Sequence, residues 1–165
     1  MRTYPPRTLA VCLALAAAAA LGIALASETW GGLVPCALCL VERWPYRILI
    51  VIGLVAAIAP RRLVRPFLSL SILALLASLT LAIIHVGVEQ GFWPSPLPEC
   101  AAPHITGASI AERLATLPAR PSKPCDSPTF LIPGLPLSMA SMNLLFSLIL
   151  LGIIAALLPA RPHRR

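Results

Sequence analysis

Long apolar stretches alternate with short polar segments along this chain. Four of the stretches lie at about residues 9–26, 40–59, 67–88 and 137–158. A helix needs roughly 20 apolar residues to cross the hydrocarbon core of a bilayer, and each stretch meets or approaches that length. The pattern predicts an all-α membrane protein. We expect residues 1–165 to form a single transmembrane domain, a four-helix bundle.

Composition supports this prediction. The chain is 58% hydrophobic and only 12% charged, whereas a soluble domain carries about 25% charged residues. The 165 residues leave no room for a separate soluble domain beside four spans.

The first stretch has two interpretations. Arg2 and Arg7 precede it and Ala24-Leu25-Ala26 closes it, which is also the pattern of a secretory signal with a small-residue cleavage site. The apolar run is longer than a usual signal core of roughly 7–15 residues. We therefore expect it to remain as the first helix.

The basic residues set the predicted topology. The net charge is +7, and arginines gather at both ends of the chain and in the loop at 60–66. All six acidic residues fall in the other segments. Because arginine-rich loops stay in the cytoplasm, both termini and loop 60–66 are predicted to be cytoplasmic, and loops 27–39 and 89–136 to lie outside. The basic excess therefore reports topology, and we expect no nucleic-acid partner.

A Cys-x-x-Cys motif, Cys36-Ala37-Leu38-Cys39, lies at the start of the second stretch and is followed by Arg43. Pro35 is expected in the first helical turn, where its missing N–H costs nothing. Cys36 would then feel the positive end of the helix dipole, which favours a thiolate. Spacings of three and four residues place both sulfurs and the guanidinium on one helix face.

Three interpretations of this motif compete. A structural zinc site would need Cys100 and Cys125 as further ligands, and these are far apart in the sequence. A structural disulfide across two residues would close almost no loop entropy. Redox exchange is the favoured interpretation, and no metal is expected. Cys12, alone in the first stretch, is expected to be an inert small hydrophobe.

The long loop at 89–136 holds the second cysteine pair, Cys100 and Cys125, and more than half of the chain's 18 prolines. A disulfide between them would contribute roughly 3 kcal/mol by loop closure, so a structural staple is plausible. The alternative is an exposed disulfide that exchanges with another protein, because the proline-rich flanks are expected to keep the sulfurs accessible.

A short helix is predicted within this loop. Ser109 and Glu112 form a capping-box pattern, and Ile110, Leu114 and Leu117 follow at helical spacing before Pro118. We expect this amphipathic helix to lie on the outer membrane surface.

Two dithiol pairs need an electron acceptor. The chain has no haem-attachment motif, no dinucleotide-binding glycine pattern and no iron–sulfur ligand set. With these acceptors excluded, a membrane quinone is the two-electron acceptor that we expect. Arg43 could donate hydrogen bonds to a quinone carbonyl, and His85 lies at similar depth near the end of the third stretch. Glu42 is expected at the membrane interface, paired with Arg43 or Arg47.

With these features the chain resembles the disulfide bond formation protein B (DsbB) family. The resemblance rests on Pro35-Cys36-Ala37-Leu38-Cys39 with Glu42-Arg43, on His85 with Gly91-Phe92-Trp93-Pro94, and on the loop of Cys100 and Cys125. It covers nearly the whole chain. One departure is Met142 before Asn143, where relatives often place tryptophan.

The resemblance implies a thiol oxidase of the bacterial inner membrane. Cys100–Cys125 would reoxidise a periplasmic thioredoxin-fold dithiol oxidase, a DsbA-like partner. Cys36–Cys39 would reoxidise that loop pair and pass the electrons to ubiquinone or menaquinone. Arg43 and His85 would bind the quinone.

Two other functions remain possible from the sequence. The chain could be a non-enzymatic four-span scaffold with structural disulfides in its outer loops. It could also run the same chemistry in reverse, with thiols driving reduction of a quinone-like substrate.

Overall fold

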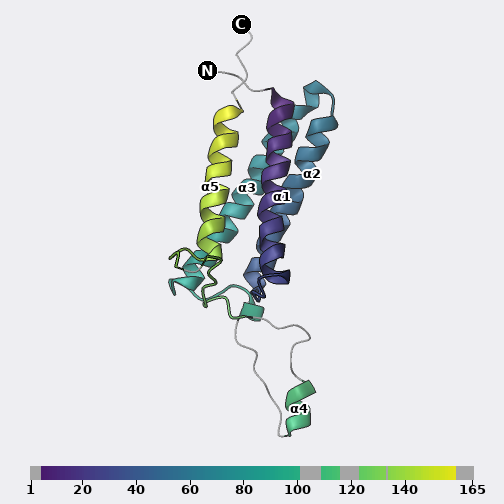
Figure 1. Ribbon diagram of the computed structural model, residues 1–165. Helices are drawn as coiled ribbons and strands as arrows, with labels where there is room; N and C mark the ends of the chain where they lie inside the picture. The colour runs from purple at the N-terminus through teal and green to yellow at the C-terminus, as the bar shows by residue number, and fades with distance from the viewer. Residues whose placement is uncertain (1–4, 101–108, 116–122, 133, 159–165) are drawn as a thin grey trace.

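Four long helices run side by side in the computed structural model, which describes residues 5–100, 109–115, 123–132 and 134–158 (Figure 1). They are α1 (Pro6–Thr29), α2 (Ala37–Ile58), α3 (Arg61–Glu89) and α5 (Met139–Leu157). Two short helices, η1 (Pro98–Cys100) and α4 (Ile110–Ala115), lie between α3 and α5 along the chain. The predicted all-α helical bundle is confirmed.

Three of the long helices, α1, α3 and α5, are long and apolar enough to cross a membrane. The fourth, α2, is of similar length but carries Glu42, Arg43 and Arg47 in one half. It packs between α1 and α3, and Glu42 and Arg43 are buried within the bundle while Arg47 is exposed. The helices coincide with the four apolar stretches, while the membrane boundaries themselves stay predictions.

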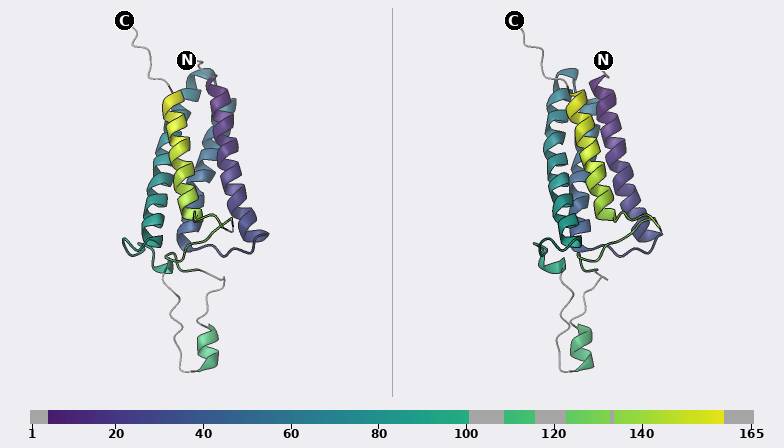
Figure 2. Two further views of the ribbon diagram at one scale, coloured as in Figure 1. Left: turned by 60° about the vertical axis from the view of Figure 1, so that its left-hand side comes forward. Right: turned by 90° about the vertical axis from the view of Figure 1, so that its left-hand side faces the viewer.

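The chain winds through the bundle from neighbour to neighbour. The main contacts join α1 to α2, α2 to α3, and α3 to α5 (Figure 2). Arg7, in the first turn of α1, donates a 2.9 Å hydrogen bond to the carbonyl of Ala59 at the end of α2. The opposite end of the bundle, where α2 begins and α3 ends, is called the cysteine end below because it holds Cys36 and Cys39.

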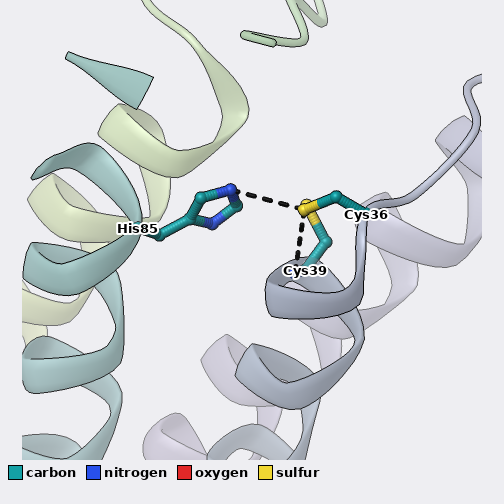
Figure 3. Close-up of side chains that lie close together, drawn as sticks. All are labelled: Cys36, Cys39 and His85. Carbon is teal, nitrogen blue, oxygen red and sulfur yellow. Dashed lines mark hydrogen bonds between the residues drawn. The ribbon is translucent and has the colours of Figure 1, made fainter. Parts of the chain in front are cut away.

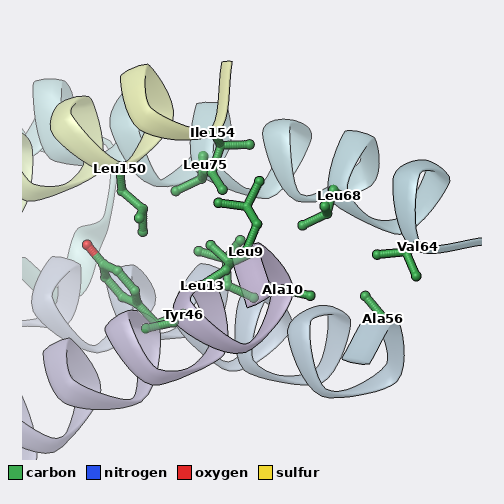
Figure 4. Packing of buried hydrophobic residues seen from close by; sticks show 12 residues of the cluster. Leu9, Ala10, Leu13, Tyr46, Ala56, Val64, Leu68, Leu75, Leu150 and Ile154 are labelled. Carbon is green, nitrogen blue, oxygen red and sulfur yellow. The ribbon is translucent and has the colours of Figure 1, made fainter. Parts of the chain in front are cut away.

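Buried leucines and small residues hold the bundle together. Leu13, Leu49, Leu68 and Leu75 are at most 1% exposed and belong to one apolar cluster shared by the long helices (Figure 4). Lipid tails are as apolar as these side chains, so close packing rather than exclusion of water drives helix association.

Small residues bring α1 and α2 close together. A Cβ added to Gly53 would lie 2.8 Å from the carbonyl oxygen of Ala10 and 2.8 Å from Cβ of Ala14. Ala10 and Ala14 belong to α1 and are both buried. The α1 segment therefore packs as a member of the bundle, and its retention in the mature protein stays a prediction.

A buried polar network crosses the bundle. The Tyr46 hydroxyl of α2 bonds to Asn143 and, at 3.0 Å, to Ser147, both on α5. Ser147 is in turn 2.9 Å from the hydroxyl of Ser78 on α3. Such interhelical hydrogen bonds satisfy polar groups that lipid could not, and they fix α5 against α2 and α3.

The second loop folds back onto the cysteine end. After α3 ends at Glu89, Gly91 takes a φ of 72° and reverses the chain. Trp93 then lies directly over Gly87, where any Cβ would collide with its ring, and donates a 3.1 Å bond to the Ile84 carbonyl. This turn leads the chain toward η1 and Cys100.

The short helix of the loop forms where the sequence predicts it. The Glu112 amide donates to the Ser109 hydroxyl at 3.2 Å, and the Ser109 amide donates to the Glu112 carboxylate at 3.2 Å. This confirms the capping box. Ile110 and Leu114 are exposed, Leu117 and Pro118 lie outside the described residues, and the placement of α4 on a membrane surface stays a prediction.

Gly53→Ala should destabilise the bundle, because the new methyl group has no space between α1 and α2. Overpacking of this kind costs about 1–3 kcal/mol. Thermal unfolding in detergent should show a lower midpoint. Gly22→Ala is the matched control, since nothing lies within 4 Å of a Cβ added there. Equal midpoints for the two variants would contradict the close α1–α2 contact.

Candidate active site

Cys36 occupies the N-cap of α2. Its backbone is extended, and its Sγ accepts a 3.3 Å hydrogen bond from the amide of Cys39. The first amides of a helix have no partner within the helix, so a side chain at this position usually satisfies one of them. Here a sulfur takes that place. The expectation that Pro35 begins the helix is wrong, since α2 begins two residues later.

The two sulfurs of the motif lie together as free thiols. Sγ of Cys39 is 3.1 Å from Sγ of Cys36, and no disulfide joins them (Figure 3). Cys36 is buried and Cys39 is half-buried. The pair can therefore lose two protons and two electrons and close into a disulfide without a large movement of the backbone.

His85 reaches the motif from α3. Its Nε2 lies 3.4 Å from Sγ of Cys36, and its Nδ1 lies 3.1 Å from Oε1 of Glu42 (Figure 3 shows the ring facing the sulfurs). Both His85 and Glu42 are buried, at 2% and 6% exposed. The result is a buried chain of contacts from a carboxylate through an imidazole to a sulfur.

The expected pairing of Glu42 is therefore wrong. Glu42 contacts His85 rather than Arg43 or Arg47, and its position at the membrane interface stays a prediction. Its spacing of three residues after Cys39 puts both on one helix face, which is the signal that could have identified it. Arg47 instead lies 5.0 Å from the ring of Trp44.

The surroundings of Cys36 favour its thiolate. The hydrogen bond between the Cys36 and Cys39 side chains lowers the pKa of Cys36 to about 4, and the hydrogen bond and charge of His85 act in the same direction against the opposing effect of burial. Cys36 also lies at the N-terminus of α2, where the positive end of the helix dipole stabilises a thiolate. Since the thiolate is the reactive form of cysteine, this sulfur is activated at neutral pH.

The second cysteine pair lies against the first. Cys100 and Cys125 form a disulfide, and they share a buried cluster with Cys36, Leu38 and Val88. The amide of Cys125 donates to the carbonyl of Cys100 at 3.2 Å. All four loop and motif cysteines therefore lie at the cysteine end.

The loop disulfide is buried, so the expectation that its sulfurs are accessible is wrong. Cys100 is 4% exposed and Cys125 is 1% exposed. The chain around Lys123 pairs with Cys36 in a parallel bridge and brings this segment over the start of α2. At Cys100 and Cys125, apolar packing thus outweighs the tendency of proline-rich flanks to keep the sulfurs accessible.

A cavity of ≈ 290 Å³ lies beside the motif, between α1, α2 and α5. Its lining includes Cys39, Glu42 and Arg43 from α2, Glu28 from α1 and Asn143 from α5. Arg43 is buried and forms a 2.8 Å ion pair with Glu28. His85 is not part of this lining and contacts Cys36 instead.

Two hydrogen-bond donors on the cavity lining lack partners. Within the part of the chain that the structure describes, Nε of Arg43 and Nδ2 of Asn143 are buried without a hydrogen bond. Leaving such a group unsatisfied costs about 1–3 kcal/mol. The cavity is therefore suited to a mainly apolar ligand with acceptor oxygens.

Comparisons with known proteins agree with the resemblance seen in the sequence. A family model described as "Disulfide bond formation protein DsbB" matches residues 6–157. The chain is also similar to "Uncharacterized protein RP370" of Rickettsia prowazekii (strain Madrid E), at 36% identity over 124 residues, which cover 73% of this chain and 70% of the relative. No solved structure matches.

The lowered pKa of Cys36 predicts how its alkylation depends on pH. With half the thiolate present near pH 4, the rate constant for a small alkylating reagent should be nearly constant between pH 6 and 8. An ordinary thiol, with a pKa near 8.5, would react about tenfold faster per pH unit there. Peptide mass spectrometry of a Cys12→Ser variant measures this rate for Cys36 separately from Cys39.

Cys39→Ala is the informative comparison, because it removes the largest cause of the lowered pKa of Cys36. In this variant the alkylation of Cys36 should require a higher pH. A tenfold rise per pH unit in the protein that retains Cys39 would contradict the assigned thiolate.

Proposed function

Because the chain belongs to the family of disulfide bond formation protein DsbB, which makes it an integral membrane oxidoreductase of disulfide bond formation, we propose that it is a quinone-dependent thiol oxidase. It accepts electrons from a periplasmic thioredoxin-fold dithiol oxidase, DsbA-like, and delivers them to a membrane quinone. In this proposal the cysteine end faces the periplasm of the bacterial inner membrane and both termini face the cytoplasm, as the arginine distribution predicts.

The observation that carries the proposal is the packing of two cysteine pairs in one buried cluster. Thiol–disulfide exchange requires a thiolate to reach a disulfide sulfur, and its rate depends on access and on the pKa of both thiols. Pairs that pack in one cluster can exchange without a diffusing carrier.

The first exchange is with the partner. A partner thiolate attacks the Cys100–Cys125 disulfide, a mixed disulfide forms, and the partner's second thiolate releases it. The partner leaves with a disulfide, and Cys100 and Cys125 keep two electrons and take up two protons. Because both sulfurs are buried, the segment around Cys125 has to lift from the start of α2 for the partner to enter.

The second exchange is internal. A thiolate of the reduced loop pair attacks the Cys36–Cys39 disulfide, which restores Cys100–Cys125 and leaves Cys36 and Cys39 as thiols. The described structure has this combination of a loop disulfide and a free Cys36 and Cys39.

The side chains around Cys36 are placed to take up its proton. Nε2 of His85 lies within reach of the Cys36 sulfur, while Glu42 holds the other ring nitrogen. The imidazole can therefore take the proton of Cys36 as its thiolate forms, and the buried carboxylate stabilises the charged ring. Cys39, the sulfur that borders the cavity, is the one positioned to pass electrons onward.

The cavity residues fit a quinone, either ubiquinone or menaquinone. Arg43 and Asn143 each bring an unpartnered buried donor to a mainly apolar cavity, and a quinone ring has two carbonyl acceptors on an apolar frame. Once bound, a quinone supplies a sink for two electrons and two protons. Arg43 would hold it beside Cys39 and would stabilise negative charge on its oxygen. The quinone contact expected of His85 stays a prediction.

A non-enzymatic scaffold is the second candidate, and the burial of Cys100 and Cys125 favours it to the extent that buried disulfides often only stabilise a fold. Such a protein would show no thiol turnover.

Cys36→Ser and Cys100→Ser should each abolish turnover, because each breaks one of the two exchange steps. The assay follows reoxidation of a reduced DsbA-like protein by membranes that contain the variant, together with formation of one quinol per disulfide. Cys12→Ser is the control, since Cys12 contacts neither pair and should leave turnover unchanged. Normal turnover in Cys36→Ser or Cys100→Ser would favour the scaffold.

Arg43→Ala should raise the apparent KM for quinone about 10- to 100-fold, since a hydrogen bond from a charged donor contributes about 1.5–3 kcal/mol. The KM for the protein substrate should stay the same. Arg47→Ala is the matched control, because Arg47 lies on Trp44 outside the cavity lining. An equal quinone KM in the Arg43 and Arg47 variants would remove the role assigned to Arg43.

A further inference from the structure

Three metal-ligating atoms converge at the start of α2. Sγ of Cys36, Sγ of Cys39 and Nε2 of His85 all lie within 4.8 Å of one another (Figure 3). Thiolate sulfur and imidazole nitrogen are the ligands that zinc prefers, and a set of three protein ligands leaves the fourth tetrahedral position open for water.

The separations between these atoms suit a tetrahedral ion. With the usual zinc–ligand bond lengths, a sulfur and a nitrogen lie about 3.6 Å apart and two sulfurs about 3.8 Å apart. The Cys36 sulfur is 3.4 Å from Nε2 of His85 and 3.1 Å from the Cys39 sulfur. To bind the ion the sulfur pair has to open, and the Cys39 sulfur, which lies within 4.8 Å of Nε2 of His85, has to take its place about 3.6 Å from that nitrogen. Cys39 is half-buried and borders the cavity, so its side chain has space to rotate.

Glu42 completes the arrangement from behind the histidine. Its Oε1 lies 3.1 Å from Nδ1 of His85, and this contact keeps Nε2 directed at the two sulfurs. A carboxylate on the far nitrogen is the usual partner of a zinc-bound histidine, and its loss typically weakens metal binding 10- to 100-fold.

The local charges also allow a divalent cation. Two thiolates neutralise its charge, and the nearby guanidinium of Arg43 is already paired with Glu28 at 2.8 Å. Lys123, whose backbone pairs with Cys36, directs its ammonium group to the Pro128 carbonyl and the Thr129 hydroxyl.

We propose that the reduced protein binds one Zn²⁺ through Cys36, Cys39 and His85, with Glu42 orienting the histidine, and that the bound ion keeps the dithiol from forming its disulfide. Binding transfers no electrons. It releases two protons, one from the Cys39 thiol and one shared by Cys36 and His85. The oxidised pair has no thiolate to offer, so zinc and the Cys36–Cys39 disulfide exclude each other. The sequence expectation of no metal considered only cysteines as ligands and did not place His85 beside them.

The test uses the full-length protein in detergent with Cys12, Cys100 and Cys125 replaced by serine, so that Cys36 and Cys39 are the only cysteines. The reduced protein is equilibrated with ZnCl₂, freed of unbound metal and assayed for zinc. We expect one zinc per reduced chain and none per chain oxidised beforehand. Zinc should also slow oxidation of the dithiol by a chemical oxidant, and a chelator should restore the rate.

Competition with a chromophoric chelator gives the affinity. His85→Gln should lower it at least 10-fold, and Glu42→Gln about 10-fold. Glu89→Gln is the matched carboxylate control, because Glu89 bonds to Ser138 and not to His85, and it should bind as tightly as the parent. Wild-type affinity in His85→Gln, or equal zinc in reduced and oxidised protein, would overturn the proposal.

Cobalt provides a readout that needs no ligand substitution. Reduced protein with Co²⁺ should show the intense visible bands of a tetrahedral site together with thiolate-to-metal charge transfer, and their absence would also overturn the proposal. Zinc binding does not depend on the thiol oxidase activity. Failure to reduce quinone therefore leaves the zinc site standing, and failure to bind zinc leaves the oxidase standing.

Discussion

The position of Cys36 at the N-cap of α2 is the constraint on which the site depends. A helix leaves its first amides without partners in the helix. Here the sulfur of Cys36 accepts a hydrogen bond from one of them, the amide of Cys39. That contact fixes the sulfur where the dipole of α2 favours a thiolate. It also brings Cys36 against α3, where His85 meets it at 3.4 Å, and under the loop that carries Cys100 and Cys125.

The packing of α2 against α3 gives the site its chemistry. His85 comes from α3, whereas Glu42 and both sulfurs come from α2 or its N-cap. The carboxylate, imidazole and sulfur are therefore aligned only while the two helices keep their register. The polar network of Tyr46, Ser78 and Ser147 helps to hold that register. Burial costs such polar groups a great deal unless they are paired, and pairing them across helices makes their arrangement specific.

The two sulfurs of the motif face different surroundings. Cys36 lies in the cluster with the loop disulfide, while Cys39 borders the cavity with Arg43 and Asn143. This division suits a relay in which one sulfur meets a protein disulfide and its neighbour meets a lipid-soluble acceptor.

Much of the fold and part of the site could be predicted from the sequence. Hydrophobic runs indicated four helices, and the Ser109–Glu112 pattern indicated α4, because both signals are local. The roles of Glu42 and Asn143 and the burial of Cys125 depend on which helix faces which, and one sequence does not contain that pairing. The sequence pairs Glu42 with a nearby arginine, whereas its actual partner, His85, lies 43 residues away. Proline content predicts accessible sulfurs, whereas Cys100 and Cys125 pack with Leu38 and Val88 and are buried.

The central claim is that the two cysteine pairs exchange directly, and trapping the exchange tests it most directly. In a Cys12→Ser, Cys39→Ser double variant, Cys36 is the only free thiol and lies against the Cys100–Cys125 disulfide. We predict a disulfide from Cys36 to Cys100 or Cys125 in non-reducing peptide mass spectrometry, with the other loop cysteine free for alkylation. A variant in which Cys100–Cys125 stays intact and Cys36 stays fully alkylatable would contradict the account.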